Sequence, residues 1–250
     1  MISAVILTKN EENQIGDCIE ALDFCNEIIL VDDNSSDKTQ ELAKEKKAKI
    51  FVRDMNMNYS QQSNFGLEKA RGEWVLFIDA DERISEKLRD EIIYVLKNES
   101  ENAGYFLTRI DYIWGKWLKY GEVNKFKSLR LVRKHSGHWK RRVHPFFSIN
   151  GKTKTLVNPI LHYPHQSTTE FIIAINRWST WHALANYDEG KKSSLNKIFL
   201  YPIMKFILIY LFRLGFLDGI QGLVFSIIMS FHSYLSWSKL WLIQNKKNQA

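Results

Sequence analysis

The feature that most constrains this chain is an apolar run, residues 74–82 (WVLFIDADE), that ends abruptly in acids. Its length and composition predict a buried β-strand. Asp79 and Asp81 stand two positions apart at its end, where strand alternation would point both carboxylates the same way. Two converging carboxylates suit a hard divalent cation such as Mg²⁺ or Mn²⁺, and such a cation suits a diphosphate. The alternative is a strand end whose acids are simply solvated.

Two earlier segments repeat this pattern. Residues 2–8 form an apolar run followed by a polar cluster, and residues 27–31 form another that closes on acids and small polar residues. Three such strands, with helical patterns between them, predict a parallel α/β sheet. Ligands of such sheets bind beyond the carboxyl ends of the strands. One rim is therefore expected to carry the polar side chains Thr8, Asp32, Asp33, Asp79 and Asp81.

These segments resemble the family 2 glycosyltransferases, which have the GT-A fold and invert the configuration at the sugar. The matching residues, in order, are 8–12 (TKNEE), 31–39 (VDDNSSDKT), Asn64, Ala70, Gly72 and 77–82 (FIDADE). The most specific part of this match is its Asp-Ala-Asp-Glu ending.

A later set of residues resembles one branch of the family. This branch contains bacterial enzymes that glycosylate the lipopolysaccharide core, of the heptose β-1,4-glucosyltransferase type. The matching residues are 130–133 (RLVR), Trp139, 143–144 (VH), 161–163 (LHY) and 215–219 (GFLDG). The resemblance implies a nucleotide-sugar donor, in the first place UDP-glucose or a similar UDP-hexose. It also implies a lipid-linked or lipopolysaccharide core acceptor.

The resemblance further implies roles for the rim residues. Asp81, supported by Asp79, would hold Mg²⁺ or Mn²⁺, which offsets charge on the leaving diphosphate. Glu82 is expected to pair with Arg83 or Arg109 instead. The residues expected to bind the nucleotide-sugar are Thr8, Asn10, Glu11, Asp32, Asp33, Asn64 and Asp79. For Asn64 a second interpretation is open, because it follows a helix start and could cap the helix.

An inverting transfer also needs a base that takes the proton from the acceptor hydroxyl. Related core-modifying enzymes often carry a Glu just after the Val-His pair, but here Pro145 occupies that position and cannot act as a base. The nearest titratable group is His144, since histidine titrates near neutral pH. The other candidates are Asp111, Glu122 and His162. For each histidine a structural role is the alternative.

Charge is distributed unevenly along the chain. Residues 1–115 contain 14 Lys and Arg against 23 Asp and Glu, whereas residues 116–142 contain ten against one. An evenly basic chain would favour nucleic acid more strongly, so nucleic acid is not an expected ligand. The basic stretch, with its interleaved aromatic residues, predicts a surface for an anionic glycolipid acceptor or an anionic membrane leaflet. Its candidate residues are Trp114, Trp117, Arg130, Arg133, Trp139 and Arg142.

Two alternatives remain for this basic stretch. Aromatic and basic residues together can also bind single-stranded nucleic acid. The charges can instead be solvated while the Trp residues lie in the core.

The C-terminal region is predicted to be helical and membrane-associated. Apolar residues recur at helical spacing in 169–187, and residues 198–212 and 223–242 are two further apolar stretches. Neither is a clean run of ~20 apolar residues, the length that a bilayer span needs. Basic and Trp residues flank both, which favours helices lying in the membrane interface. The alternatives are a hairpin packed on the catalytic domain or on a second subunit, giving a homo-oligomer, and true spanning.

The sequence thus predicts an α/β protein with the GT-A fold, a mostly parallel sheet flanked by helices, and a C-terminal helical extension. Residues 1–165 would form the glycosyltransferase domain, with a nucleotide-sugar half (1–100) and an acceptor half (101–165). Residues 166–250 would form the helical region. The N-terminus shows no cleavable signal peptide. The expected enzyme is a metal-dependent hexosyltransferase of lipopolysaccharide synthesis, cytoplasmic and peripheral on the cytoplasmic face of the bacterial inner membrane.

Two other functions are weighed against this one. A sugar nucleotidyltransferase also uses a parallel sheet and acidic metal ligands, but it normally needs a Gly-rich, basic phosphate loop after its first strand. Residues 8–12 are acidic instead. The other alternative is a non-catalytic protein that binds membranes or nucleic acid through its basic half.

Overall fold

The computed structural model describes residues 1–98, 101–122, 127–142, 145–164 and 167–247. The chain divides into two compact units. The sheet unit comprises Met1–Ile110 and Lys125–His162, and the helical unit comprises Asp111–Asn124 and Tyr163–Ala250. Residues 111–124 therefore group with the C-terminal helices, although they precede much of the sheet in the chain.

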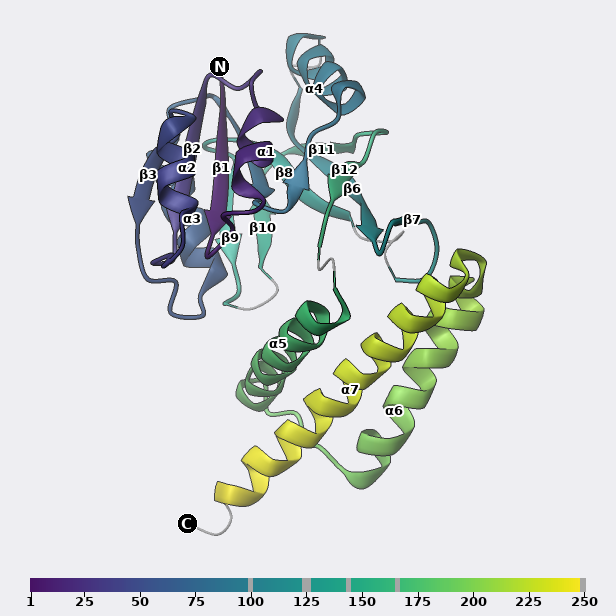
Figure 1. The fold of residues 1–250 in the computed structure, drawn as a ribbon. Helices are drawn as coiled ribbons and strands as arrows, with labels where there is room; N and C mark the ends of the chain where they lie inside the picture. Colours follow the sequence, from purple (N-terminus) through teal and green to yellow (C-terminus); the bar gives the residue numbers. More distant parts are fainter. Residues whose placement is uncertain (99–100, 123–126, 143–144, 165–166, 248–250) are drawn as a thin grey trace. The chain divides into compact units, whose positions relative to one another are not determined.

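Four parallel strands form the first half of the sheet (Figure 1). In spatial order they are β3 (Lys49–Val52), β2 (Glu27–Asp32), β1 (Ile2–Thr8) and β4 (Trp74–Asp79). The crossover helices between them are α1 (Ile15–Glu20), α2 (Thr39–Glu45) and α3 (Tyr59–Lys69). In this register Thr8 pairs with Asp32 and Leu7 with Asp79, so the strands end at one edge. The predicted α/β sheet and its acidic rim are both present.

The second half of the sheet adds strands of both directions, with β8 antiparallel to its neighbours and β11 parallel to β6. Next to β4 lies β8 (Lys127–Arg133), followed by β6 (Asn102–Ile113), β12 (Ile160–His162) and β5 (Glu82–Arg83). Two short strands, β11 (Lys152–Thr155) and β7 (Lys116–Leu118), also pair with β6. Helix α4 (Glu86–Asn98) follows β5, and a separate hairpin consists of β9 (Gly137–Lys140) and β10 (Phe146–Ile149). The sheet is thus mixed, with its parallel part at the expected acidic rim.

Strand alternation creates two hydrophobic layers, one on each face of the sheet. One layer joins Ala4, Ile6, Leu76 and Ile78 to buried residues of α1, α2 and α4. The other joins Val5, Val75 and Phe77 to α3 and to the β9–β10 hairpin. Burial of each large aliphatic side chain contributes about 1.5–3 kcal/mol. These layers fix the strands whose ends carry the acids.

The helical unit is built on three long helices. They are α5 (Thr168–Asp188), α6 (Leu195–Ile207) and α7 (Ile220–Lys247), with the π-helical turn η2 (Leu208–Phe212) extending α6. Helix α7 packs against both α5 and α6 (Figure 1). Apolar residues from α5, η2, α7 and β7 form its buried core. The predicted C-terminal helical region is therefore confirmed.

A tight corner joins α6 and η2 to α7. Leu214 adopts a left-handed conformation with φ 58°, and the short 3₁₀ helix η3 (Gly215–Asp218) follows. A Cβ atom at Gly222 would lie 1.9 Å from the carbonyl oxygen of Gly215, so only glycine permits this close approach of α7 to η3. The corner thereby sets the antiparallel packing of the two helices.

Candidate active site

The strand ends place Thr8, Asp32 and Asp33 at one edge of the sheet. Asp32 is fully buried, and its two carboxylate oxygens accept hydrogen bonds from the backbone and hydroxyl of Ser35 and from Nε2 of Gln40. It therefore shapes the loop after β2. Asp33 is ion-paired to Lys9 at 2.9 Å, and its second oxygen accepts the backbone N–H of Met55.

The Thr8 hydroxyl is a different case. It is buried at the end of β1, and Oγ1 has no hydrogen-bond partner among the described residues. A buried hydroxyl without a partner is unfavourable, so it is a candidate contact for a ligand at this edge.

Two neighbouring loops interlock beside these strand ends. The backbone N–H of Asn10 donates to Ser35 Oγ, and Asn10 Oδ1 accepts the backbone N–H of Ser36 at 2.8 Å. The backbone N–H of Glu11 donates to Thr39 Oγ1 at 2.7 Å. Asn10 and Glu11, both expected to contact the nucleotide, thus hold the first loop against the second. Asn10 does so in a left-handed conformation, φ 56°, which Asn tolerates better than most residues.

Asp79, the last residue of β4, lies beside a buried guanidinium. Nη2 of Arg130 is 2.9 Å from Asp79 Oδ2 and 3.1 Å from Glu82 Oε1. The other oxygen of Glu82 accepts the backbone N–H of Asp79 at 3.0 Å. Arg109 is farther from Glu82, at 3.9 Å. Burial acts to lower the pKa of Arg130, but the charges of Asp79 and Glu82 outweigh it and raise the pKa.

Asp81 has a separate partner. Strand β4 ends at Asp79, so strand alternation does not govern Asp81, which lies in the turn before β5. Its Oδ2 is 3.1 Å from Nε2 of His162, the last residue of β12. Burial acts to raise the pKa of the Asp81 carboxyl, but the charge and hydrogen bond of His162 and the charge of Arg109 hold it below its usual range. The two acids of the Asp-x-Asp pair are therefore bonded to different groups.

Comparison with known proteins identifies the family. Residues 3–161 match the family described as glycosyl transferase family 2. The chain belongs to this family. The family and the observed sheet together confirm the expected GT-A-like fold and the assignment as a glycosyltransferase. They favour glycosyl transfer over the nucleotidyltransferase and non-catalytic alternatives.

Similar proteins span nearly the whole chain. The lipopolysaccharide core biosynthesis glycosyltransferase LpsC of Rhizobium meliloti (strain 1021) is 29% identical over 251 residues, covering 96% of this chain and 92% of LpsC. An uncharacterized glycosyltransferase of Rickettsia typhi is 30% identical, covering 96% of this chain and 86% of that protein. The solved structure of S. aureus TarS 1–349 is 16% identical, with a TM-score of 0.49, over 99% of this chain and 91% of that one.

The family implies a divalent cation, and the donor set of this glycosyltransferase fits one in part. The Asp81 carboxylate and a ring nitrogen of His162 face each other, and both are metal-ligating groups. Among the described residues, no group of three or more His, Cys, Asp or Glu side chains is placed to hold a metal ion by itself. Mg²⁺ often takes only one or two protein ligands and fills its shell with water and substrate phosphates. From the sequence, His162 is expected only as a candidate base. Its place in residues 161–163, which resemble the lipopolysaccharide core enzymes, is the signal that could have marked it as a site residue.

Asn64 does not cap α3 in this glycosyltransferase. The cap of α3 is Asn58, whose side chain accepts the backbone N–H of Gln61. Asn64 lies one turn further on, and its amide exchanges two hydrogen bonds, of 2.9 and 2.8 Å, with the backbone carbonyl and N–H of Trp139. It thus ties α3 to β9.

Three of the expected acceptor or membrane residues have partners within the sheet unit. Arg130 is buried with Asp79 and Glu82, as described above. Trp139 is buried between Phe77 and Phe147, at ring distances of 5.0 and 5.6 Å. Arg133 pairs with Glu73 and stacks on Trp74.

The other three residues of that set have different surroundings. Arg142 is exposed and donates to backbone carbonyls of Asn56 and Met57. In the helical unit, Trp114 packs on Phe171 at 6.1 Å. Trp117 is half-buried, and its ring lies 5.0 Å from Tyr112 and 5.5 Å from Tyr163.

The other candidate bases are His144, Glu122 and Asp111. His144 lies outside the described residues. Glu122 is ion-paired with Lys205, and Arg213 lies 3.9 Å from the same oxygen. Asp111 is buried in β6 opposite Leu118.

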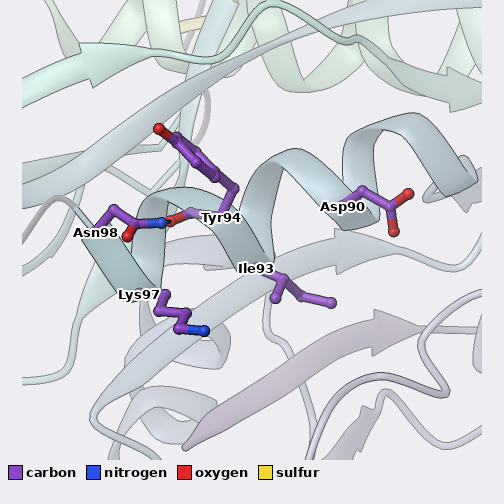
Figure 2. Close-up of a pocket in the computed structure, with 5 residues that line it drawn as sticks. All are labelled: Asp90, Ile93, Tyr94, Lys97 and Asn98. Carbon is purple, nitrogen blue, oxygen red and sulfur yellow. Dashed lines mark hydrogen bonds between the residues drawn. The ribbon is translucent and has the colours of Figure 1, made fainter.

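A surface hollow lies elsewhere, along α4 (Figure 2). It is lined by Asp90, Ile93, Tyr94, Lys97 and Asn98. All five residues belong to one helix and none is a strand-end acid, so the hollow is not part of the candidate site.

Proposed function

We propose that this family 2 glycosyltransferase transfers a hexose, with inversion, from a UDP-sugar such as UDP-glucose to a lipopolysaccharide core or other membrane-anchored glycolipid acceptor. The acceptor class is supported by the likeness to LpsC over 96% of the chain. The single observation that carries the chemistry is the Asp81–His162 pair, which gives the sheet edge a carboxylate and an imidazole 3.1 Å apart.

The donor would lie across the ends of β1, β2 and β4. The unpartnered Thr8 hydroxyl and the Asp33 carboxylate would contact the nucleoside, because both lie at the end of their strands. Asp32, Asn10 and Glu11 would act indirectly, by holding the two loops in place.

Asp81 and His162 would hold Mg²⁺ or Mn²⁺, with Asp79 beside them, and the cation would offset charge on the leaving diphosphate. Asp79 is also bonded to Arg130, which fixes the orientation of its carboxylate. In this arrangement Asp81 and His162 would be the ligands of the cation, and the buried Arg130 would position Asp79.

The acceptor hydroxyl needs a base, for which His144 and Asp111 are the proposed residues. Glu122 is a weaker choice, because its ion pair with Lys205 commits its carboxylate to a helix contact. Trp117, with Tyr112 and Tyr163, offers half-buried aromatic rings to a sugar face. Replacing His144 by Ala and Asp111 by Asn, one at a time, should identify the base by the loss of the acidic limb of the pH–rate profile, because a general base acts only when it is deprotonated.

The deciding experiment is nucleotide release from a panel of UDP-, GDP- and CMP-sugars, with and without Mn²⁺ or Mg²⁺. It is paired with the thermal shift caused by each nucleotide, since a ligand that binds only the native state raises stability. Metal-dependent stabilisation and release with UDP-sugars, lost in Asp81→Asn, is the expected result. Equal turnover after thorough chelation would contradict the cation, and stabilisation by GDP or CMP alone would contradict the donor.

A further inference from the structure

Exposed apolar side chains cover one part of the helical unit, where Lys205 and Arg213 are only partly exposed. In residues 199–217, all of which the structure describes, every exposed side chain is apolar or aromatic and none is charged. These side chains, called here the apolar helical surface, are Phe199, Leu200, Tyr201, Ile203, Met204, Leu208, Leu211, Phe212, Leu214, Phe216 and Leu217. Soluble monomers rarely expose contiguous apolar patches of this kind without a binding role.

The segment beneath this surface is hardly packed. Of the residues Leu195–Phe212, only 11% are buried, and the buried members are Ile198 and Ile209. Among the described helices, this one is long and apolar enough to cross a membrane by length and composition. Its surroundings decide between crossing a bilayer and lying along its surface.

One end of this helical segment is held by polar bonds to residues 116–122. The buried carboxylate of Asp218 accepts the backbone N–H groups of Lys119 and Tyr120, and Lys116 Nζ donates to the Asp218 carbonyl at 2.7 Å. Glu122 is ion-paired with Lys205 in the last turn of α6. These bonds bring charged and polar groups to the corner after η2, so the corner does not suit the hydrocarbon core of a membrane.

The other end of the segment is reached through α5, the helix that precedes α6 in the chain. Helix α5 exposes Asn176, Arg177 and Thr180 near its middle, so it does not suit the hydrocarbon core. The ion pair of Glu122 with Lys205 also lies inside the stretch Leu195–Phe212, and an ion pair does not suit the hydrocarbon core. For both reasons α6 and η2 fit the membrane interface and do not fit a span.

The net charge of the C-terminal region decides whether the apolar helical surface binds a lipid membrane or a second copy of the chain. Residues 190–250 contain eight Lys and Arg and one acid, Asp218, which is buried. An anionic leaflet attracts such a segment by about 1 kcal/mol per basic residue near the surface. A second copy would bring the same basic charges together and be repelled.

From these observations we infer that the apolar helical surface docks on an anionic phospholipid membrane, with α6 and η2 lying in the interface. This surface gives the enzyme a membrane-binding function that is independent of the transfer reaction. Vesicle binding involves no turnover, so its failure is distinguishable from failure of the proposed activity.

The test is cosedimentation of the full chain with vesicles of phosphatidylethanolamine and phosphatidylglycerol, and with neutral phosphatidylcholine vesicles. The test variant carries Phe199→Asp, Ile203→Asp and Phe212→Asp, at side chains that are 63%, 56% and 78% exposed. The matched control carries Ile93→Asp and Val157→Asp in the sheet unit, at side chains that are 45% and 85% exposed. Circular dichroism melts confirm that both variants fold.

Wild type and control should bind the anionic vesicles, and the test variant should bind at least about tenfold more weakly, because acids replace apolar side chains at the interface. Binding to neutral vesicles should be weaker for all. Equal binding of the test variant and wild type to anionic vesicles would overturn the proposal. It would also be overturned if wild type did not bind vesicles but formed a dimer in ultracentrifugation, and the test variant abolished that dimer. Alkaline carbonate should release the wild-type enzyme from cell membranes, and retention would contradict the interfacial position.

Discussion

The carboxylate of Asp81, in the turn before β5, lies 3.1 Å from Nε2 of His162 at the end of β12, although the two residues are separated by 81 positions in the chain. The contact gives the edge of the sheet two metal-ligating groups, while the neighbouring Asp79 is bonded to Arg130. Replacing either Asp81 or His162 removes this contact and one of the two metal-ligating groups.

Asp81→Asn and His162→Ala should each lower metal-dependent transfer by about 100-fold, on the scale of losing a ligand or its close support. The measurement is nucleotide release as a function of Mn²⁺ concentration. Asp90→Asn on α4 is the matched control, because it removes an acid outside the site. Near-normal turnover in the Asp81 variant would exclude that residue as a ligand.

Arg130→Met should destabilise the fold by about 3–5 kcal/mol, because it leaves the buried Glu82 carboxylate without its nearest cation. Arg130→Lys keeps the charge but loses the planar fork, so its effect should be smaller. Urea unfolding of the three proteins gives the comparison. An unchanged unfolding midpoint for Arg130→Met would show that Arg109, at 3.9 Å, is sufficient.

Asn64→Ala should cost about 1–3 kcal/mol for each backbone group of Trp139 that is left unsatisfied. Thermal or urea unfolding measures the loss. Gln61→Ala, at an exposed position of the same helix, controls for the change in helix propensity. If Asn64→Ala instead spares stability and weakens nucleotide binding, the amide contacts the donor after all.

Glu27 predicts a pH dependence of stability. Burial acts to raise the pKa of its carboxyl, but hydrogen bonds from Ser3 and Arg71 and the charge of Arg71 lower the pKa below its usual value. Its stabilising contribution is therefore present above the unfolded pKa of about 4.3 and is lost as the pH falls through the lower folded value.

Glu27→Gln should consequently be less stable than wild type at pH 7, and the difference should shrink below about pH 4. Urea unfolding of both proteins across this range measures it. A difference that stays constant with pH would show that the hydrogen bonds, and not the ionised carboxylate, carry the contribution.

The local parts of this fold could be predicted, and the pairings across it could not. The strands β1, β2 and β4 were predictable because an apolar run and its polar end are adjacent in the sequence. The partners of Asp79 and Asp81 lie 51 and 81 positions away, and no local pattern encodes such a pairing. The assignment of Asp81 by alternation failed because β4 ends at Asp79.

The sequence around Trp139 contains a pattern that predicts its burial. Its basic neighbours suggested a surface residue, but within β9 the exposed residues His138 and Lys140 flank it on both sides. Period-two alternation therefore placed Trp139 on the opposite, buried face. The basic composition around Arg130 suggested a binding surface, but the guanidinium is buried and is bonded to Asp79 and Glu82.

The interlocked loops after β1 and β2 have a consequence for affinity. Side chains of the second loop already hold the backbone N–H groups of Asn10 and Glu11. The conformational entropy of these two loops is thus already lost on folding, before any ligand binds. A donor that binds to these loops should bind more tightly, because binding does not have to offset the entropic cost of ordering them.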